Sequence, residues 1–152
     1  MTSSSGRWAR YAATGYVRPG REVRVLAVSN VALNAVHEFA HIVTMAVQAD
    51  APNNPRWLWE SVAVFENGEL VDPHVWPFLP NGPFPTLTQL NGDPNVSTVV
   101  YQVGYTIAEF IVNRFGRSAL LQLIQTHGDI PGVLGISVTE FESQWVAYVK
   151  AR

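Results

Sequence analysis

The chain of 152 residues contains no cysteine, which excludes a disulfide framework and any metal site built from thiolates. A bound metal would therefore have to be held by imidazole and carboxylate groups. Lysine occurs only once, and the nine arginines are scattered along the chain, apart from a loose group between Arg7 and Arg24, rather than gathered in a stripe. Because a basic stripe is missing, we expect no nucleic-acid partner.

Long hydrophobic runs are also absent. No uninterrupted apolar stretch approaches the roughly 18 residues of a membrane span, so we expect no membrane-spanning segment. The first ten residues, MTSSSGRWAR, lack the apolar core of a signal peptide. A cytoplasmic location is expected if the chain is complete, and nothing else in the sequence indicates a compartment.

The composition is that of a globular protein, with 47% hydrophobic and 14% charged residues. The length suits one core, so we expect residues 1–152 to form a single domain. Residues 1–28 contain β-branched and aromatic runs broken by glycine and proline, which predict a short, mostly antiparallel sheet with its clearest strand at 22–28. Residues 29–152 have mainly helical periodicity. The expected fold class is therefore α+β.

Five helices are predicted in the second part. The first begins after Ser29 or Asn30, and its recurring apolar residues are expected to face the core: Val31, Ala35, Phe39, Ile42 and Ala46. The second begins near Asn54 and Pro55 and ends at Asn67-Gly68. Residues 69–96 are rich in Pro, Gly and Asn and are expected to be mostly loop. Three more helices are predicted within 96–116, 117–128 and 137–152.

Half of the four histidines fall in one short stretch, NAVHEFAHIV, which contains His37, Glu38 and His41. Residues four apart on a helix share a face, so both imidazoles can point at one metal ion. A catalytic zinc ion needs three protein ligands and an open position for water, and Glu38 can act on that water as a general base. The alternative is that both histidines are polar residues at the edge of a packed helix.

A third ligand is offered by Glu60, which lies in the otherwise apolar segment PRWLWESVAVF. A carboxylate buried among apolar residues is costly without a charged partner, and a metal ion is such a partner. The alternative is that Glu60 faces water from an amphipathic helix.

These residues resemble the gluzincin metallopeptidases, in particular the aminopeptidase-N-type branch and the peptidase MA-like domains. HEFAH is followed by eighteen residues and then by Glu60, and NPRWLWESVAVFENGE is similar to the family segment P-x-W-L-x-E-G-x-A-x-Y. The similarity extends from about residue 22 to the C-terminus. It implies a zincin-like fold, a peptidase acting on a peptide or protein substrate, and one zinc ion on His37, His41 and Glu60.

The resemblance also implies the catalytic roles. Glu38 would be the general base and later carry a proton to the leaving amine. Tyr101, in the sequence Tyr101-Gln-Val-Gly104, would donate to the developing oxyanion, and Tyr105 is the second choice. Either tyrosine could instead be a packed aromatic residue.

The chain departs from the family at several positions. Ser61 replaces a glycine, Phe65 replaces a tyrosine, and Val64 stands where thermolysin-like relatives have an aspartate that supports a histidine ligand. Other candidates for that supporting role are Glu66, Asn67 and Asp72. The motif Gly-x-Met-Glu-Asn, which binds a free amino terminus, is absent, so strict aminopeptidase action is not expected.

Two function classes remain open from the sequence. The first is a zinc-dependent peptidase, and the second is a non-catalytic zincin-like module that binds a peptide or protein. His74 and His127 lie in loop and helix-end contexts and receive no metal role. The aromatic residues of the long loop, Trp76, Phe78 and Phe84, are expected to pack over the core rather than to line a cleft.

Overall fold

The computed structural model describes residues 15–18, 22–26, 30–68, 70–79, 82–93 and 95–152. They form two strands, seven α-helices and three short 3₁₀ turns. The strands are β1 (Gly15–Arg18) and β2 (Glu22–Val25). The helices are α1 (Val31–Val47), α2 (Arg56–Glu66), α3 (Leu87–Gly92), α4 (Val100–Phe115), α5 (Arg117–Gln125), α6 (Ile130–Leu134) and α7 (Val138–Lys150), and the 3₁₀ turns are η1 (Ala51–Asn53), η2 (Pro73–Val75) and η3 (Ser97–Val99). The structure is mainly helical with a small antiparallel sheet, which confirms the coarse α+β prediction.

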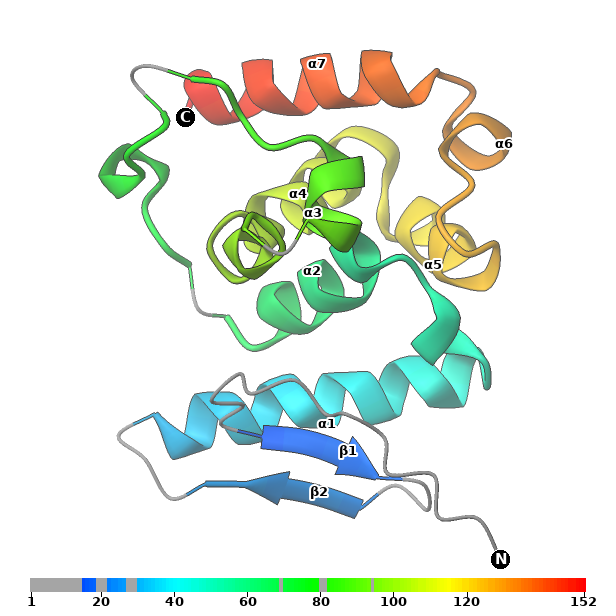
Figure 1. Cartoon of the computed structure of the whole chain (residues 1–152). Helices are drawn as coiled ribbons and strands as arrows, with labels where there is room; N and C mark the ends of the chain where they lie inside the picture. Colours follow the sequence, from blue (N-terminus) through cyan, green and yellow to red (C-terminus); the bar gives the residue numbers. More distant parts are fainter. Residues whose placement is uncertain (1–14, 19–21, 27–29, 69, 80–81, 94) are drawn as a thin grey trace, which may run out of the picture.

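Helix α1 lies between the two-stranded sheet and the remaining helices (Figure 1). The strands pair antiparallel, with Gly15 opposite Val25 and Val17 opposite Val23. Strand β2 ends at Val25, and Leu26 is described outside it. Residues 27–28 of the predicted strand lie outside the described residues, as do residues 1–14. Among the described residues, no helix is long and apolar enough to cross a membrane.

The hydrophobic core lies among the helices on the other side of α1. Its largest fully buried side chains include Phe141 and Trp145 of α7 and Ile107 and Ile111 of α4. The indole nitrogen of Trp145 donates to the hydroxyl of Thr106 at 3.0 Å. The loop aromatics belong to this core, since Trp76 is buried and Phe78 and Phe84 pack against it. Their predicted packing role is confirmed.

Helices α2 and α4 cross closely because a glycine stands at their contact. A Cβ atom at Gly104 would come within 3.1 Å of both Cα and Oγ of Ser61. A larger residue at 104 would therefore push apart the two helices that carry Glu60 and Tyr101.

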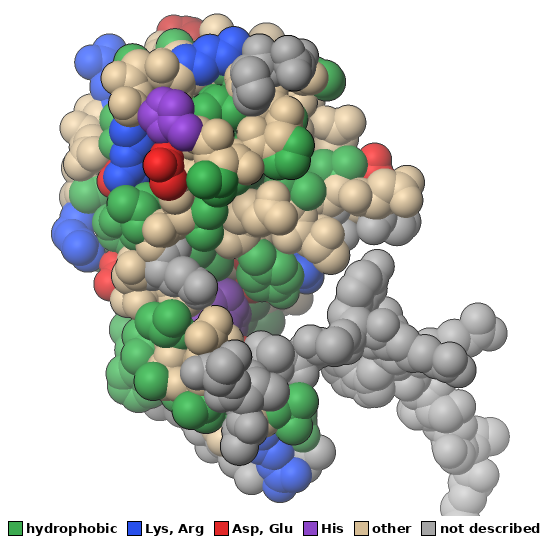
Figure 2. All heavy atoms as spheres, turned by 90° about the vertical axis from the view of Figure 1, so that its left-hand side faces the viewer, with side chains coloured by type: hydrophobic (Ala, Val, Ile, Leu, Met, Phe, Trp, Pro, Cys, Tyr) green, Lys and Arg blue, Asp and Glu red, His purple; other side chains and the backbone are tan. Residues whose placement is uncertain are grey.

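The predicted core face of α1 is wrong. Val31, Phe39 and Ala46 are exposed, and Phe39 keeps 60% of its surface open. The buried residues of α1 are instead Glu38, Ala40, His41 and Thr44. The helix thus turns its polar side inward toward α2. In Figure 2, hydrophobic side chains occupy much of the described surface of the part that holds α1 and the sheet.

Helix boundaries are confirmed where a specific residue ends or caps a helix. Asn67 follows the last residue of α2, and Gly116, the glycine expected to stop the third helix, ends α4 with φ of 90°. Thr139 and Ser137 are both possible caps of the last helix from the sequence, and the Ser137 side chain is the one that caps α7. Asn54 does not cap α2, because Pro55 holds that position and the Asn54 side chain meets His127 at 3.0 Å. The loop at 69–96 contains an unpredicted short helix, α3, which begins with a capping box formed by Thr86 and Gln89.

Candidate metal centre

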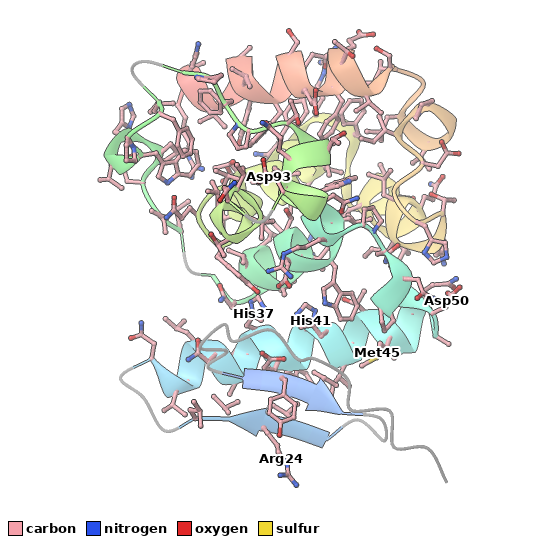
Figure 3. All side chains as sticks on the ribbon, in the orientation of Figure 1. Arg24, His37, His41, Met45, Asp50 and Asp93 are labelled. Carbon is pink, nitrogen blue, oxygen red and sulfur yellow. The ribbon has the colours of Figure 1, made fainter. Side chains whose placement is uncertain are left out.

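Three side chains from two helices converge between α1 and α2. The Nε2 atoms of His37 and His41 lie 3.3 and 3.7 Å from Oε2 of Glu60. All three ligand atoms lie within 4.8 Å of one another. In Figure 3 both imidazoles point from α1 toward α2, whereas Arg24 points away from the centre on the far side of the sheet. The predicted ligand set is therefore brought together, and it could hold a metal ion.

The protonation of this cluster suits a metal ion. Burial alone would raise the pKa of Glu60, but the two facing imidazoles outweigh it and lower that pKa to about 2. Burial lowers the pKa of His41, so its ring favours the neutral form. A carboxylate and a neutral imidazole are the forms that bind a metal.

The Oε2 atom of Glu60 is buried and has no hydrogen-bond partner among the described residues. A buried carboxylate oxygen left in this way is unfavourable by itself. Because the same atom faces both imidazoles, a cation between the three side chains would remove the penalty.

Packing against Trp59 holds the ring of His41. Its ring stacks on Trp59 with a centroid separation of 4.1 Å and an interplanar angle of 7°. Its Nδ1 atom is buried without a partner among the described residues. Two of the expected supporting residues are engaged elsewhere, since Glu66 pairs with Arg117 and Asp72 pairs with His74.

Glu38 is buried beside the ligand set without belonging to it. Burial raises its pKa, the charge of Glu60 adds to this effect, and His37 opposes it. A raised pKa makes a carboxylate a better proton acceptor near neutral pH. Strand β1 approaches this side chain closely, because a Cβ atom at Gly15 would lie 2.8 Å from Oε1 of Glu38.

Tyr101 lies at the centre, whereas Tyr105 does not. The Tyr101 hydroxyl donates to Oε1 of Glu60 at 3.3 Å, and its ring lies 6.1 Å from that of His37. Burial and the Glu60 carboxylate raise the pKa of Tyr101 to about 12, so its hydroxyl stays protonated. Tyr105 packs on Phe65 with a centroid separation of 5.3 Å. The geometry therefore favours the first of the two predicted tyrosines.

The other two histidines have different surroundings. His74 contacts Asp72 at 2.9 Å in the exposed turn η2. His127 lies between Asn54 and Asp50, and so links the end of α5 to the turn before α2. Neither belongs to the group of three ligand candidates.

Sequence reasoning missed three residues that shape the centre: Gly15, Arg56 and Trp59. Arg56 stands four residues before Glu60, which is the spacing of a helical ion pair, and this signal could have found it. The stacking of Trp59 and the approach of Gly15 depend on tertiary packing, and no local pattern indicates them.

Comparison of this chain with protein-family models, with curated proteins and with solved structures finds no match. The evidence for function is therefore the geometry of the centre and the motif that supplies its side chains.

Proposed function

We propose that this chain is a zinc-dependent peptidase with a zincin-like fold, acting on a peptide or protein substrate. The observation that carries the proposal is the convergence of His37, His41 and Glu60 around a buried carboxylate oxygen, Oε2 of Glu60, that has no hydrogen-bond partner among the described residues. The placement of α1 between the sheet and α2 agrees with a zincin-like arrangement (Figure 1).

The donor set fits one zinc ion. Ligands at about 2.1 Å around a tetrahedral zinc lie roughly 3.4 Å from one another. The two nitrogens lie 3.3 and 3.7 Å from Oε2 of Glu60, which is close to that spacing, and all three ligand atoms lie within 4.8 Å of one another. Two histidines and a glutamate also leave the fourth position open, as a catalytic zinc requires.

The residues around the ligand set supply the remaining chemistry. A bound zinc ion would lower the pKa of a water molecule toward about 7 and polarise a substrate carbonyl group. Glu38 would accept the proton of the attacking water and pass it to the leaving amine. Tyr101 would turn its hydroxyl from Glu60 to the carbonyl oxygen, where negative charge develops.

Acetylated and free-amine forms of one peptide test the substrate class. Because the motif that binds a free amino terminus is absent, we expect both forms to be cleaved at similar rates. The measurement is kcat/KM for each form with the zinc-loaded protein. Complete dependence on a free amine would contradict this prediction.

The change Tyr101→Phe removes one hydroxyl from the centre. Losing one donor to an oxyanion typically lowers kcat by about 10²–10³, so we expect a loss of that order with zinc content unchanged. The matched control is Tyr105→Phe, which removes a hydroxyl from the same helix outside the centre. Full kcat in Tyr101→Phe would remove Tyr101 from the mechanism.

The change Gly15→Ala is expected to displace Glu38, because the added Cβ would stand 2.8 Å from its Oε1. A misplacement of about 1 Å can lower the rate about 10²-fold, so we expect a fall in kcat of up to that size with zinc binding unchanged. Gly92→Ala is the matched control, since a Cβ there meets nothing within 4 Å. Equal kcat in both variants would show that β1 does not position Glu38.

A second candidate function is a non-catalytic module that binds a protein partner. The exposed apolar residues of α1, including Val36, Phe39 and Val43, favour it, because large apolar surfaces often mark contact sites. A binding module has no need of a general base, and the buried Glu38 beside the ligands therefore favours the peptidase.

A further inference from the structure

One charged residue at the centre has no part in the roles above. Arg56 is the first residue of α2 and stands one helical turn before Glu60. Its backbone N–H donates to the side-chain oxygen of Asn91 at 2.5 Å, which fixes the start of the helix. Its guanidinium extends along α2 toward the metal ligands.

The guanidinium closes a triangle with Glu60 and Tyr101. Its NH1 atom lies 3.4 Å from Oε1 of Glu60, and its NH2 atom donates to the Tyr101 hydroxyl at 3.0 Å. The Tyr101 hydroxyl in turn donates to the same Oε1 at 3.3 Å. Arg56 also lies over the Tyr101 ring, with its Cζ atom 5.4 Å from the centroid.

This triangle divides the two oxygens of Glu60 between different tasks. Oε1 pairs with the Arg56 guanidinium and accepts a hydrogen bond from the Tyr101 hydroxyl, whereas Oε2 faces the two imidazoles. A carboxylate held in this way presents one oxygen to a metal ion. Its surroundings differ from those of an exposed surface pair, because only 8% of the Glu60 side chain is open to solvent.

The triangle also sets the direction of the Tyr101 hydroxyl. Because the phenol oxygen accepts from a cationic donor, its own hydrogen points elsewhere, and the polarised O–H becomes a stronger donor. Arginine suits this task because its planar fork can reach two acceptors at once, which the single ammonium group of lysine cannot do in the same geometry.

We infer that Arg56 is a positioning residue of the centre, which holds Glu60 so that Oε2 alone faces the metal and directs the Tyr101 hydroxyl as a donor. The expected effect of Arg56 on catalysis rests on the proposed peptidase function. The expected effect of Arg56 on zinc affinity does not depend on peptidase activity.

The metal arm of the test compares zinc dissociation constants, measured by chelator competition, for the parent, Arg56→Met and Arg56→Lys. Loss of an outer partner typically weakens metal binding by about 10–100-fold, and we expect this for Arg56→Met and a smaller loss for Arg56→Lys. If Arg56 acted only by repelling the zinc ion, its replacement by methionine would strengthen zinc binding. Weaker zinc binding in Arg56→Met would therefore indicate that Arg56 positions Glu60. Parental or tighter zinc binding in either variant would overturn the inference.

Arg117→Met is the matched control, because Arg117 also pairs with a glutamate of α2, Glu66, at 3.2 Å but outside the centre. We expect parental zinc affinity in this variant. A loss equal to that of Arg56→Met would mean that any arginine pair on α2 has the same effect, which would overturn a specific role for Arg56.

The activity arm is a double-mutant cycle on kcat with Arg56→Met and Tyr101→Phe. If Arg56 acts through the Tyr101 hydroxyl, its replacement lowers kcat about tenfold or more in the parent and less than about twofold once that hydroxyl is gone. If the double variant loses kcat by the product of the two single losses, Arg56 does not act through the Tyr101 hydroxyl. If the zinc-loaded parent cleaves no peptide, the proposed function fails, while the zinc constants still decide whether Arg56 positions Glu60.

Discussion

The change Glu38→Gln is expected to lower kcat for peptide hydrolysis by about 10²–10⁴, with one zinc ion still bound. The amide has nearly the same shape as the carboxylate but cannot accept a proton from water. Glu38 lies outside the ligand set, so His37, His41 and Glu60 remain in place to hold the metal. The measurement combines kcat on a cleaved peptide with zinc content.

The same variant carries a prediction about stability. Burial raises the pKa of Glu38, so its ionised form is less favourable in the folded protein than in the unfolded chain. The neutral amide removes this penalty, and we expect the metal-free variant to unfold at the same temperature as the parent or at a higher one. The control is Glu66→Gln, which changes an exposed glutamate on the same α2 helix as Glu60. Full activity in Glu38→Gln would remove Glu38 as the general base.

The change Glu60→Gln is expected to weaken zinc binding by more than 100-fold. Losing an outer partner of a ligand typically weakens metal binding by about 10–100-fold, and Glu60 is proposed as a ligand itself. The amide keeps the size of the side chain but loses the negative charge between the two imidazoles. Thermal unfolding with and without zinc measures the effect.

The parent is expected to gain about 2.7 kcal/mol of unfolding free energy at a zinc concentration of 100 times its dissociation constant. Glu60→Gln should gain almost nothing at that concentration. His74→Gln is the control, because His74 is exposed and lies outside the ligand group. An equal zinc-dependent shift in Glu60→Gln and the parent would show that zinc binds elsewhere.

The three side chains of the candidate metal centre are easier to predict from the sequence than the buried face of α1. The spacing of His37, His41 and Glu60 depends on short motifs within two helices, so it predicts the three side chains that the structure brings together. The buried face of α1 was mispredicted because periodicity assumes that apolar residues turn inward. Because the polar side chains of His37, His41 and Glu60 gather between α1 and α2, α1 turns a polar face inward, and Phe39 is exposed as a result.

The features of the centre that the sequence does not predict depend on contacts between residues far apart in the chain. Tyr101 meets Glu60 across 41 positions and Arg56 across 45, so no local pattern separates Tyr101 from Tyr105. The capping box at Thr86 and Gln89 was a local signal for α3 that the high content of loop-forming residues concealed. The end of α2 at Asn67 is predictable because it depends on residues at the helix end itself, whereas the sequence leaves Thr139 and Ser137 open as caps of α7 and the structure shows Ser137.

The central claim, that this chain is a zinc peptidase, is tested most directly by incubating the parent, loaded with one equivalent of zinc, with a broad peptide library. We expect cleavage that stops when a chelator removes the metal, returns when zinc is restored and is nearly absent in zinc-loaded Glu38→Gln. A parent that holds one zinc ion at His37, His41 and Glu60 and cleaves no peptide would contradict this claim, and would favour the module that binds a partner.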